Sequence, residues 1–279
     1  MAGHLQLYDS GGQRVLLGHQ LGVGGEGAVF EVQGAPRLAA KWYKHQPSAD
    51  KASKLRAMAH VSDAALTSIA AWPIGTLHKT SSGPLVGFLM PKVSGYRPIH
   101  ELYSPAQRKF CFPKADWAFL VHTARNVASA VAGIHARGYV LGDINQGNVL
   151  VAPNATVTLI DCDSFQVRVN GRHFLCEVGV PEFTPPELHG RGTFSGVIRT
   201  PNHDAFGLAV LIFHLLFMGR HPFAGRFLGR GDKPIDDAIR EFRFAFGQAA
   251  ASRGMTAPPY SLNLLQTSAE IASLFERVV

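Results

Sequence analysis

The sequence predicts a mixed α+β protein of two lobes with a cleft between them. The first third of the 279-residue chain alternates short apolar runs with glycine-rich turns, as strands and hairpins do. The later part carries apolar residues at helical spacing, most clearly from Trp117 to His135. Between the two parts, the stretch from Pro91 to Gly95 contains the proline and glycine that are typical of a hinge.

Strands and one helix are expected in the first part. Asp9-Ser10-Gly11-Gly12 lies between alternating apolar residues, which indicates a hairpin. The residues from Gly22 to Val32 are typical of a strand, a turn and a second strand. Ser48 is a suitable N-cap, because its hydroxyl oxygen can accept a hydrogen bond from a free amide of the first helical turn. The helix that follows would place Ala52, Leu55, Met58 and Ala59 on one face, and further strands are expected over residues 38–43, 74–77 and 86–90.

Helices dominate the expectation for the second part. Residues 117–135 place their apolar side chains on one helical face, and short strands are expected at 149–151 and 157–160. From Glu187 onward the pattern indicates helices and loops. We therefore divide the chain into an N-terminal lobe, residues 1–93, and a C-terminal lobe, residues 94–279.

The composition is that of a soluble globular protein. Hydrophobic residues make up 46% of the chain and charged residues 17%, which is enough apolar material for a core. The formal charge of +7 comes from scattered lysines and arginines, so a nucleic-acid partner is not expected. Three cysteines without paired spacing favour a reducing compartment and form no zinc pattern. No apolar segment is long enough for a signal core or a membrane span, so we expect a cytoplasmic protein.

The first chemical motif is the glycine-rich sequence LGVGGEGAVFEV, which begins at Leu21. Gly22, Gly24 and Gly27 follow a G-x-G-x-x-G pattern, and glycines let backbone amides approach phosphate oxygens closely. Alone the pattern is weak, because a glycine-rich hairpin turn is the commoner explanation. A dinucleotide site would need a helix next, whereas the residues that follow are strand-like. The next strand ends in Lys41, at a suitable distance for a phosphate-binding lysine.

The strongest motif is GYVLGDINQGNVLV, from Gly138 to Val151. Asp143 and Asn148 lie just before a short apolar strand. A carboxylate here can orient an incoming hydroxyl and accept its proton, and an amide oxygen can bind Mg²⁺. A plain Asp/Asn turn would explain the polarity, but neither the helix before it nor the strand after it.

A further motif, VTLIDCDSF, covers residues 157–165. Asp161 ends a strand and could bind an Mg²⁺ ion that bridges two phosphates, although a strand-terminating turn is a common alternative. Asp163 adds a second carboxylate, which we interpret as a turn residue rather than an extra metal ligand.

Together these motifs resemble the eukaryotic-like Ser/Thr protein kinase family, and particularly its divergent bacterial branch associated with tellurite-resistance and phosphatase gene clusters. The resemblance covers nearly the whole chain. Pro185-Pro186-Glu187 is similar to the family's Ala-Pro-Glu at the end of the activation segment, and Asp204 to the aspartate that anchors the catalytic loop. The resemblance implies a bilobal protein-kinase fold, ATP and Mg²⁺ as cofactors, and a Ser/Thr hydroxyl of a protein as acceptor.

The resemblance also implies a role for each matching residue. Lys41 would hold the α- and β-phosphates under the glycine-rich loop, and Asp143 would be the catalytic base. Asn148 and Asp161 would be the metal ligands. Residues 91–93 would form the hinge, with Met90 as gatekeeper, and the adenine pocket would comprise Val29, Ala39, Met90, Val93 and Leu150.

Several positions depart from the family pattern. Leu141-Gly142 replaces the usual His-Arg before the catalytic aspartate, and Asn145 replaces a lysine after it. The Phe-Gly expected after the metal-binding aspartate is Cys162-Asp163. Because the missing arginine normally pairs with a phosphate on the activation segment, we expect activity without loop phosphorylation.

The helix glutamate that pairs with the phosphate-binding lysine is also missing, since the sequence has no glutamate between Glu31 and Glu101. The matching helix position carries a lysine, Lys51 or Lys54. Asp50 could reach Lys41, Asp161 could hold it alone, or the helix could lie displaced. We favour Asp161 acting alone.

Two rival functions remain. One is a pseudokinase, an ATP-binding scaffold without turnover, and the other is a small-molecule kinase resembling the aminoglycoside phosphotransferases. Expected partners are a protein substrate, the chain itself through autophosphorylation, and a phosphatase encoded nearby. The glutamate matching Glu187 normally pairs with an arginine near the end of the domain, so we expect the natural chain to continue beyond residue 279, or Arg253 or Arg277 to substitute.

Overall fold

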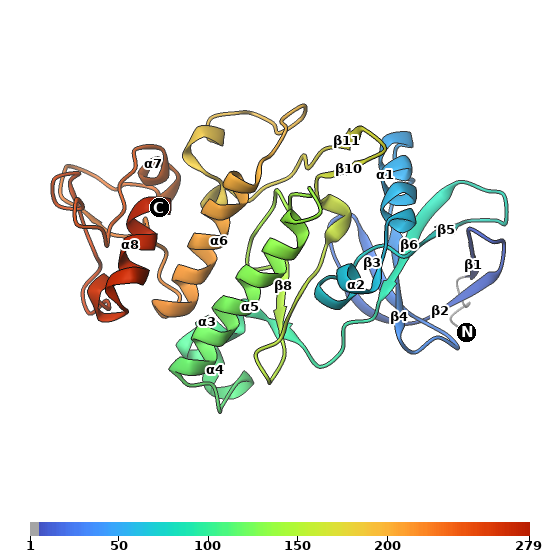
Figure 1. Ribbon diagram of the computed structural model, residues 1–279, viewed down its shortest axis with the longest axis horizontal. Coiled ribbons are helices and arrows are strands. Elements are labelled where there is room, and N and C mark those ends of the chain that lie inside the picture. The colour runs from blue at the N-terminus through green and yellow to red at the C-terminus, as the bar shows by residue number, and fades with distance from the viewer. Residues whose placement is uncertain (1–5) are drawn as a thin grey trace.

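Strands β1 to β6 form the sheet of the N-terminal lobe in the computed structural model, which describes residues 6–279 (Figure 1). The first five residues of the expected N-terminal lobe lie outside the described residues. The strands pair antiparallel in the order β1-β2-β3-β4-β6-β5, and β1 also pairs with β5, which closes the sheet. Their bounds are β1 (Gln6–Asp9), β2 (Arg14–Val23), β3 (Gly27–Val32), β4 (Leu38–Tyr43), β5 (Gly75–His78) and β6 (Leu85–Pro91).

The predicted strands of this lobe are confirmed, but the closure of the sheet was not predicted. Tyr8 of β1 lies opposite His78 of β5, a pairing between segments far apart in the sequence. Strand alternation predicts which face of a strand is buried, not which distant strand it pairs with. The closed sheet encloses a small core of Leu7, Val15, Leu17, Val32, Ala40, Leu77 and Val86.

Helix α1 (Ala49–His60) packs beside the sheet and is followed by α2 (Ala64–Ile69). The predicted N-cap is confirmed, because the Ser48 hydroxyl accepts a hydrogen bond from the amide of Lys51. Ala52, Leu55 and Met58 are buried, as their spacing predicted, whereas Ala59 is only half-buried. Lys54 is also buried on this helix, which the apolar pattern did not predict.

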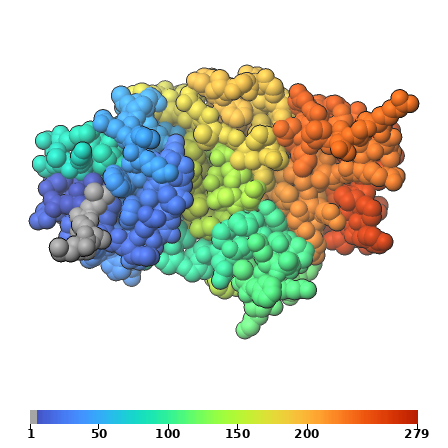
Figure 2. All heavy atoms as spheres, turned by 180° about the vertical axis from the view of Figure 1, so that it is seen from behind, coloured from blue at the N-terminus to red at the C-terminus, as the bar shows by residue number. Residues whose placement is uncertain are grey.

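The C-terminal lobe is mainly helical and is built around α5 (Trp117–His135) and α6 (Pro201–Leu216). The bounds of α5 agree with the predicted helix. A stacked pair of rings, Phe213 and Phe217, has centroids 4.0 Å apart in the core of this lobe. Figure 2 shows the blue N-terminal lobe and the red end of the chain at opposite ends of the molecule, with the middle of the chain between them.

Short elements complete the C-terminal lobe. They are β7 (Arg97–Pro98), α3 (Ile99–Tyr103), α4 (Pro105–Cys111), β8 (Val149–Val151), β9 (Val157–Leu159), β10 (Val167–Val169), β11 (Arg172–Phe174), β12 (Arg226–Phe227), α7 (Ile235–Arg240), β13 (Met255–Thr256) and α8 (Ala269–Val278). Single 3₁₀ turns are η1 (Cys162–Ser164), η2 (Pro181–Phe183), η3 (Pro186–Leu188) and η4 (Leu264–Gln266). The β10–β11 hairpin and the β12–β13 pair were not predicted. No helix within residues 6–279 has the length and apolarity needed to cross a bilayer.

Candidate active site

A cleft of about 1000 Å³ lies between the two lobes and contains every predicted site residue. Its volume is at the upper end of the usual range for small-molecule sites. The predicted residues that line it are Gly22, Gly24, Gly27, Val29, Ala39, Lys41, Met90, Val93, Asp143, Asn148, Leu150 and Asp161.

The roof of the cleft is the turn between β2 and β3. Around Gly22 and Gly25 an added Cβ would meet no atom within 4 Å, so the turn leaves open space beneath its backbone. Gly27 has a different reason to be glycine, because a Cβ there would lie 2.4 Å from the carbonyl oxygen of Trp42 on β4. The glycine pattern therefore serves both an open roof and close strand packing.

Strand β4 places two predicted residues on the cleft side. Ala40 belongs to the core of the closed sheet, so its neighbours Ala39 and Lys41 face the other way. Ala39 lies opposite Met90 of β6, and Lys41 opposite Val29 of β3. The register of the strands therefore places the predicted adenine-pocket residues next to the predicted phosphate-binding lysine.

Lys41 binds two carboxylates rather than one. Its Nζ lies 2.6 Å from Oδ1 of Asp161 and 2.8 Å from Oδ1 of Asp163. Burial alone would lower the pKa of Lys41, but the negative charges of Asp163 and Asp161 outweigh it and raise the pKa. The ammonium group therefore stays charged at any physiological pH.

Asp163 lies in the turn η1 (Cys162–Ser164), as interpreted, but its side chain has a further role that the interpretation did not include. Its side chain is only 1% exposed, and its second oxygen, Oδ2, accepts a hydrogen bond from the Tyr43 hydroxyl at 2.5 Å. Oδ2 also lies 2.9 Å from Nζ of Lys51 on α1. Burial would raise the pKa of this carboxyl, but Lys41 and Lys51 outweigh burial and hold the pKa well below its usual range. Asp163 is a buried, ionised carboxylate surrounded by donors.

Two lysines attach α1 to the segment after β9. Besides its contact with Asp163, Lys51 Nζ lies 3.2 Å from Oε2 of Glu26 in the glycine-rich turn. Lys54 donates hydrogen bonds to the carbonyl oxygens of Ser164 at 3.0 Å and Leu175 at 3.2 Å, and burial lowers its pKa to about 8. The helix is therefore held against the cleft and is not displaced.

Asp50 does not reach Lys41. It is exposed and pairs with Arg172 of β11 at 2.5 Å. The favoured expectation, that Asp161 holds Lys41 alone, is also wrong, because Asp163 shares that contact. The sequence did contain an indication of this arrangement. Lysines occupy the helix positions where the family has a glutamate, so the carboxylate that pairs with Lys41 had to come from another segment.

The catalytic-loop residues Asp143 and Asn148 lie together, as predicted. Asn148 Nδ2 donates to Oδ2 of Asp143 at 3.2 Å, and Asn145 Nδ2 donates to Oδ1 at 3.0 Å. Burial raises the pKa of Asp143, and the two amide donors partly counter that rise. Asn145 therefore orients Asp143, a role that sequence reasoning did not assign to it.

Asp204 of α6 anchors the start of this loop, as the resemblance implied. Its two carboxylate oxygens accept hydrogen bonds from the amides of Leu141 and Gly142, each at 2.8 Å. Oδ2 also contacts Nε2 of His135 at 2.7 Å. A buried carboxylate on a long helix thus fixes the backbone that carries Asp143.

Arg199 contacts the backbone at the position just before Asp143. Its guanidinium donates to the carbonyl oxygens of Gly142 at 3.0 Å and Val178 at 3.2 Å. Gly142 has a φ of +75°, and a Cβ there would lie 2.6 Å from the Cβ of Cys176. The structure therefore explains why position 142 is glycine, which sequence reasoning recorded only as a departure.

Glu187 has a histidine as its nearest ionic partner. His203 Nε2 lies 3.6 Å from Oε1 of Glu187. Neither arginine proposed as a substitute contacts it: Arg253 donates to the carbonyl oxygen of Glu241, and Arg277 to the hydroxyl of Ser273.

The oxygen donors suit a magnesium–nucleotide complex. The Asp161 side chain is 45% exposed in the cleft, so one of its oxygens can turn to a cation. Asp161 adopts φ of +58°, a left-handed conformation that is costly for an aspartate and is often found at functional sites. Asp161 and Asn148 offer oxygen, the ligand atom that Mg²⁺ prefers.

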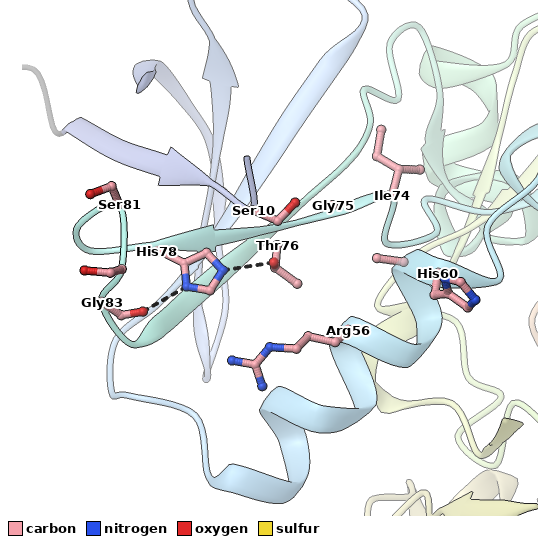
Figure 3. A pocket seen from close by; sticks show the side chains of 11 residues that line it. Ser10, Arg56, His60, Ile74, Gly75, Thr76, His78, Ser81 and Gly83 are labelled. Carbon is pink, nitrogen blue, oxygen red and sulfur yellow. Dashed lines mark hydrogen bonds between the residues drawn. The ribbon is translucent and has the colours of Figure 1, made fainter. Parts of the chain in front are cut away.

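A second, smaller hollow of about 580 Å³ shares no lining residue with the cleft (Figure 3). Arg56 and His60 of α1 face the β5–β6 hairpin across it. Its His78 ring already bonds the Thr76 hydroxyl and the Gly83 carbonyl oxygen, both at 3.0 Å. None of the predicted site residues lies there.

The chain resembles curated bacterial kinases over almost its entire length. It is 44% identical over 278 residues to "Protein kinase YegI" of Escherichia coli K12 and 45% identical over 272 residues to the protein of that name from Escherichia coli O157:H7. These matches cover 99% and 97% of the chain but only 43% and 42% of the relatives. A 93-residue stretch is 29% identical to a mouse PAS domain-containing serine/threonine-protein kinase, covering 33% of the chain and 6% of that protein. No protein-family profile matches the chain.

The fold of the chain is similar to that of a solved kinase structure. The ROP18 kinase domain, in complex with AMP-PNP and sucrose, superposes with a TM-score of 0.57 over 99% of this chain and 85% of its own, at 18% sequence identity. The chain therefore has the fold of a protein kinase domain, and the two bacterial proteins that it matches over almost its entire length are named protein kinases.

Proposed function

We propose that the chain is an ATP·Mg²⁺-dependent protein kinase that phosphorylates Ser or Thr hydroxyls of a protein. The observation that carries the proposal is the convergence of Lys41, Asp143, Asn148 and Asp161 on one cleft with an apolar inner part. The names of the relatives and the nucleotide analogue in the structural neighbour agree with it. The divergent bacterial branch stays part of the proposal.

When bound, ATP·Mg²⁺ supplies the phosphoryl group that is transferred and a cation that neutralises its charge. Lys41 binds the phosphates with an ammonium group that its two carboxylate neighbours keep charged. Asn148 and the half-exposed Asp161 present oxygen atoms to the cation. Asp143, oriented by Asn145 and Asn148, accepts the proton of the acceptor hydroxyl, and its raised pKa makes it a better base than an ordinary aspartate.

The test compares two isosteric variants. Asp161→Asn should weaken Mg²⁺-dependent nucleotide binding and abolish turnover, whereas Asp143→Asn should abolish turnover and keep binding. Binding is measured as the rise in melting temperature with ATP·Mg²⁺, and turnover by transfer of radiolabelled phosphate. Equal loss of the thermal shift in both variants would contradict these roles.

The same assay separates the rival functions. A pseudokinase would bind ATP·Mg²⁺ without any labelled product, and a small-molecule kinase would label an aminoglycoside-like acceptor but no protein. Autophosphorylation sites mapped by mass spectrometry would identify the chain as its own substrate. A nearby-encoded phosphatase as partner and a cytoplasmic location are further parts of the proposal.

A further inference from the structure

We propose that Asp163 is the positioning residue of Lys41, and that it keeps the ammonium group in place when Asp161 turns to the metal. The inference rests on the proposed function, because it assigns the partner of the phosphate-binding lysine. In other kinases a glutamate from the helix has this part, and none of the residues of α1 is a glutamate.

The two carboxylates that accept hydrogen bonds from Lys41 differ in what they can do, and a third, that of Glu26, lies 3.9 Å from the Lys41 Nζ. Asp161 is 45% exposed and faces the cleft, so a cation can draw it away from the lysine. The Asp163 side chain is 1% exposed, and donors from Lys41, Tyr43 and Lys51 occupy both of its oxygens. Both oxygens of Asp163 already contact protein donors, so we assign its standing contact to Lys41.

Helix α1 contributes a charge of the opposite sign to the one that the corresponding helix contributes in other kinases. Here α1 contributes a cation, Lys51, and the segment after β9 contributes the anion. A single buried carboxylate thus joins three parts of the site: β4 through Lys41, α1 through Lys51, and the start of the activation segment through its own backbone. Lys51 extends the network to Glu26 in the glycine-rich turn.

Burial makes this network sensitive to the charge at position 163. Lys41 contacts Oδ1 and Lys51 contacts Oδ2 of one carboxylate; Lys41 is buried, and the Lys51 side chain is 22% exposed. Removing the negative charge would leave two neighbouring cations with less compensation, so Lys41 and Lys51 would repel each other and the Lys41 ammonium group would move. A residue that only filled space would not have this effect.

The first experiment uses Asp163→Asn, an isosteric change that removes the charge, with exposed Asp50→Asn on α1 as the matched control. We expect kcat/KM for ATP to fall about 10- to 100-fold in Asp163→Asn, the range found when a group that orients a functional residue is removed. Asp163→Glu, which keeps the negative charge, should retain more activity than Asp163→Asn. A fall of less than twofold in kcat/KM for Asp163→Asn would overturn the proposal.

A second variant restores the order of charges found in other kinases. Lys51→Glu/Asp163→Gly puts a carboxylate on α1 and removes the one at position 163. Recovery of at least tenfold in kcat/KM over Asp163→Asn supports a positioning role. A double variant that folds but is no more active than Asp163→Asn contradicts it. If Asp163→Asn does not fold, the double variant is compared with the wild-type protein: a kcat/KM within tenfold of wild type supports the positioning role, and a folded double variant with a lower kcat/KM contradicts it.

A measurement without nucleotide separates this inference from the proposed function. An amine-reactive reagent and mass spectrometry give the labelling rate of Lys41 at one fixed pH, which reports how firmly its ammonium group is held. Asp163→Asn should accelerate the labelling of Lys41, while Asp50→Asn leaves the rate unchanged. If the wild-type protein is inactive but the acceleration is seen, the proposed function alone is refuted, and an unchanged labelling rate would refute the role of Asp163.

Discussion

Arg199 should hold the activation segment to the catalytic loop, and Arg199→Ala tests this directly. The substitution removes hydrogen bonds to the carbonyl oxygens of Gly142 and Val178, and a contact in which the guanidinium carbon lies 4.0 Å from the centre of the Phe194 ring. Hydrogen bonds from a charged donor contribute about 1.5–3 kcal/mol each, and the ring contact about 0.5–1 kcal/mol.

The free-energy cost of Arg199→Ala should be smaller than the sum of these three contributions, because burying the guanidinium has a cost that the substitution removes. Arg199 is buried, and its Nε has no hydrogen-bond partner among the described residues, so the group is incompletely solvated in the folded protein. We expect a local cost of about 3 kcal/mol, which corresponds to an increase of about 100-fold in opening of the segment.

Cys176 provides the assay, since its buried thiol lies in this segment beside Gly142. A thiol reagent under native conditions should label Cys176 about 100-fold faster in Arg199→Ala, whereas buried Cys162 should keep its rate. Exposed Arg191→Ala is the matched control. Unchanged labelling of Cys176, or equal acceleration at both cysteines, would refute a local anchor.

Further predictions concern Gly142, two histidines, Asp50 and phosphorylation. Gly142→Ala should destabilise by clearly more than Gly138→Ala in denaturant melts, because both glycines have positive φ, at a strain of about 1–2 kcal/mol, but only position 142 would clash with Cys176. Burial lowers the pKa of His214 and His221 to about 4, so the unfolded state binds more protons than the folded state between that pH and about 6.5. The free energy of unfolding should therefore fall as the pH decreases through this window. His221→Gln should flatten the profile of melting temperature against pH. Asp50→Ala should cost only about 0.3–1 kcal/mol and little activity, because the residue is exposed at a helix terminus; a loss equal to that of Lys41→Ala would refute this. Phosphatase treatment should leave most activity, since Arg199 already anchors the segment; a large loss would count against it.

The sequence predicted the elements whose cause is local. Periodicity located α5 to the residue, and Ser48 marked the start of α1 because N-capping depends only on neighbouring residues. The cleft residues could be assigned because glycine, lysine, aspartate and asparagine recur in a fixed order along the chain.

The partners of buried charges could not be predicted in the same way. Asp163 lies one residue beyond Cys162 in what resembled an ordinary turn, and its partners come from β4 and α1, about 110 to 120 positions earlier. Arg199 likewise contacts Gly142 across two segments that no periodic pattern relates. Such pairings depend on which loops the fold brings together.

The closed sheet of the N-terminal lobe has a consequence for association. In an open sheet, the outer strands present unpaired amides and carbonyls to which a foreign strand can bind, and this leads to strand exchange or aggregation. Here β1 and β5, which would be those outer strands, pair with each other. Where β1 and β5 pair, a protein that recognises the described part of this lobe therefore meets side chains rather than a free backbone edge, and its specificity there must come from those side chains.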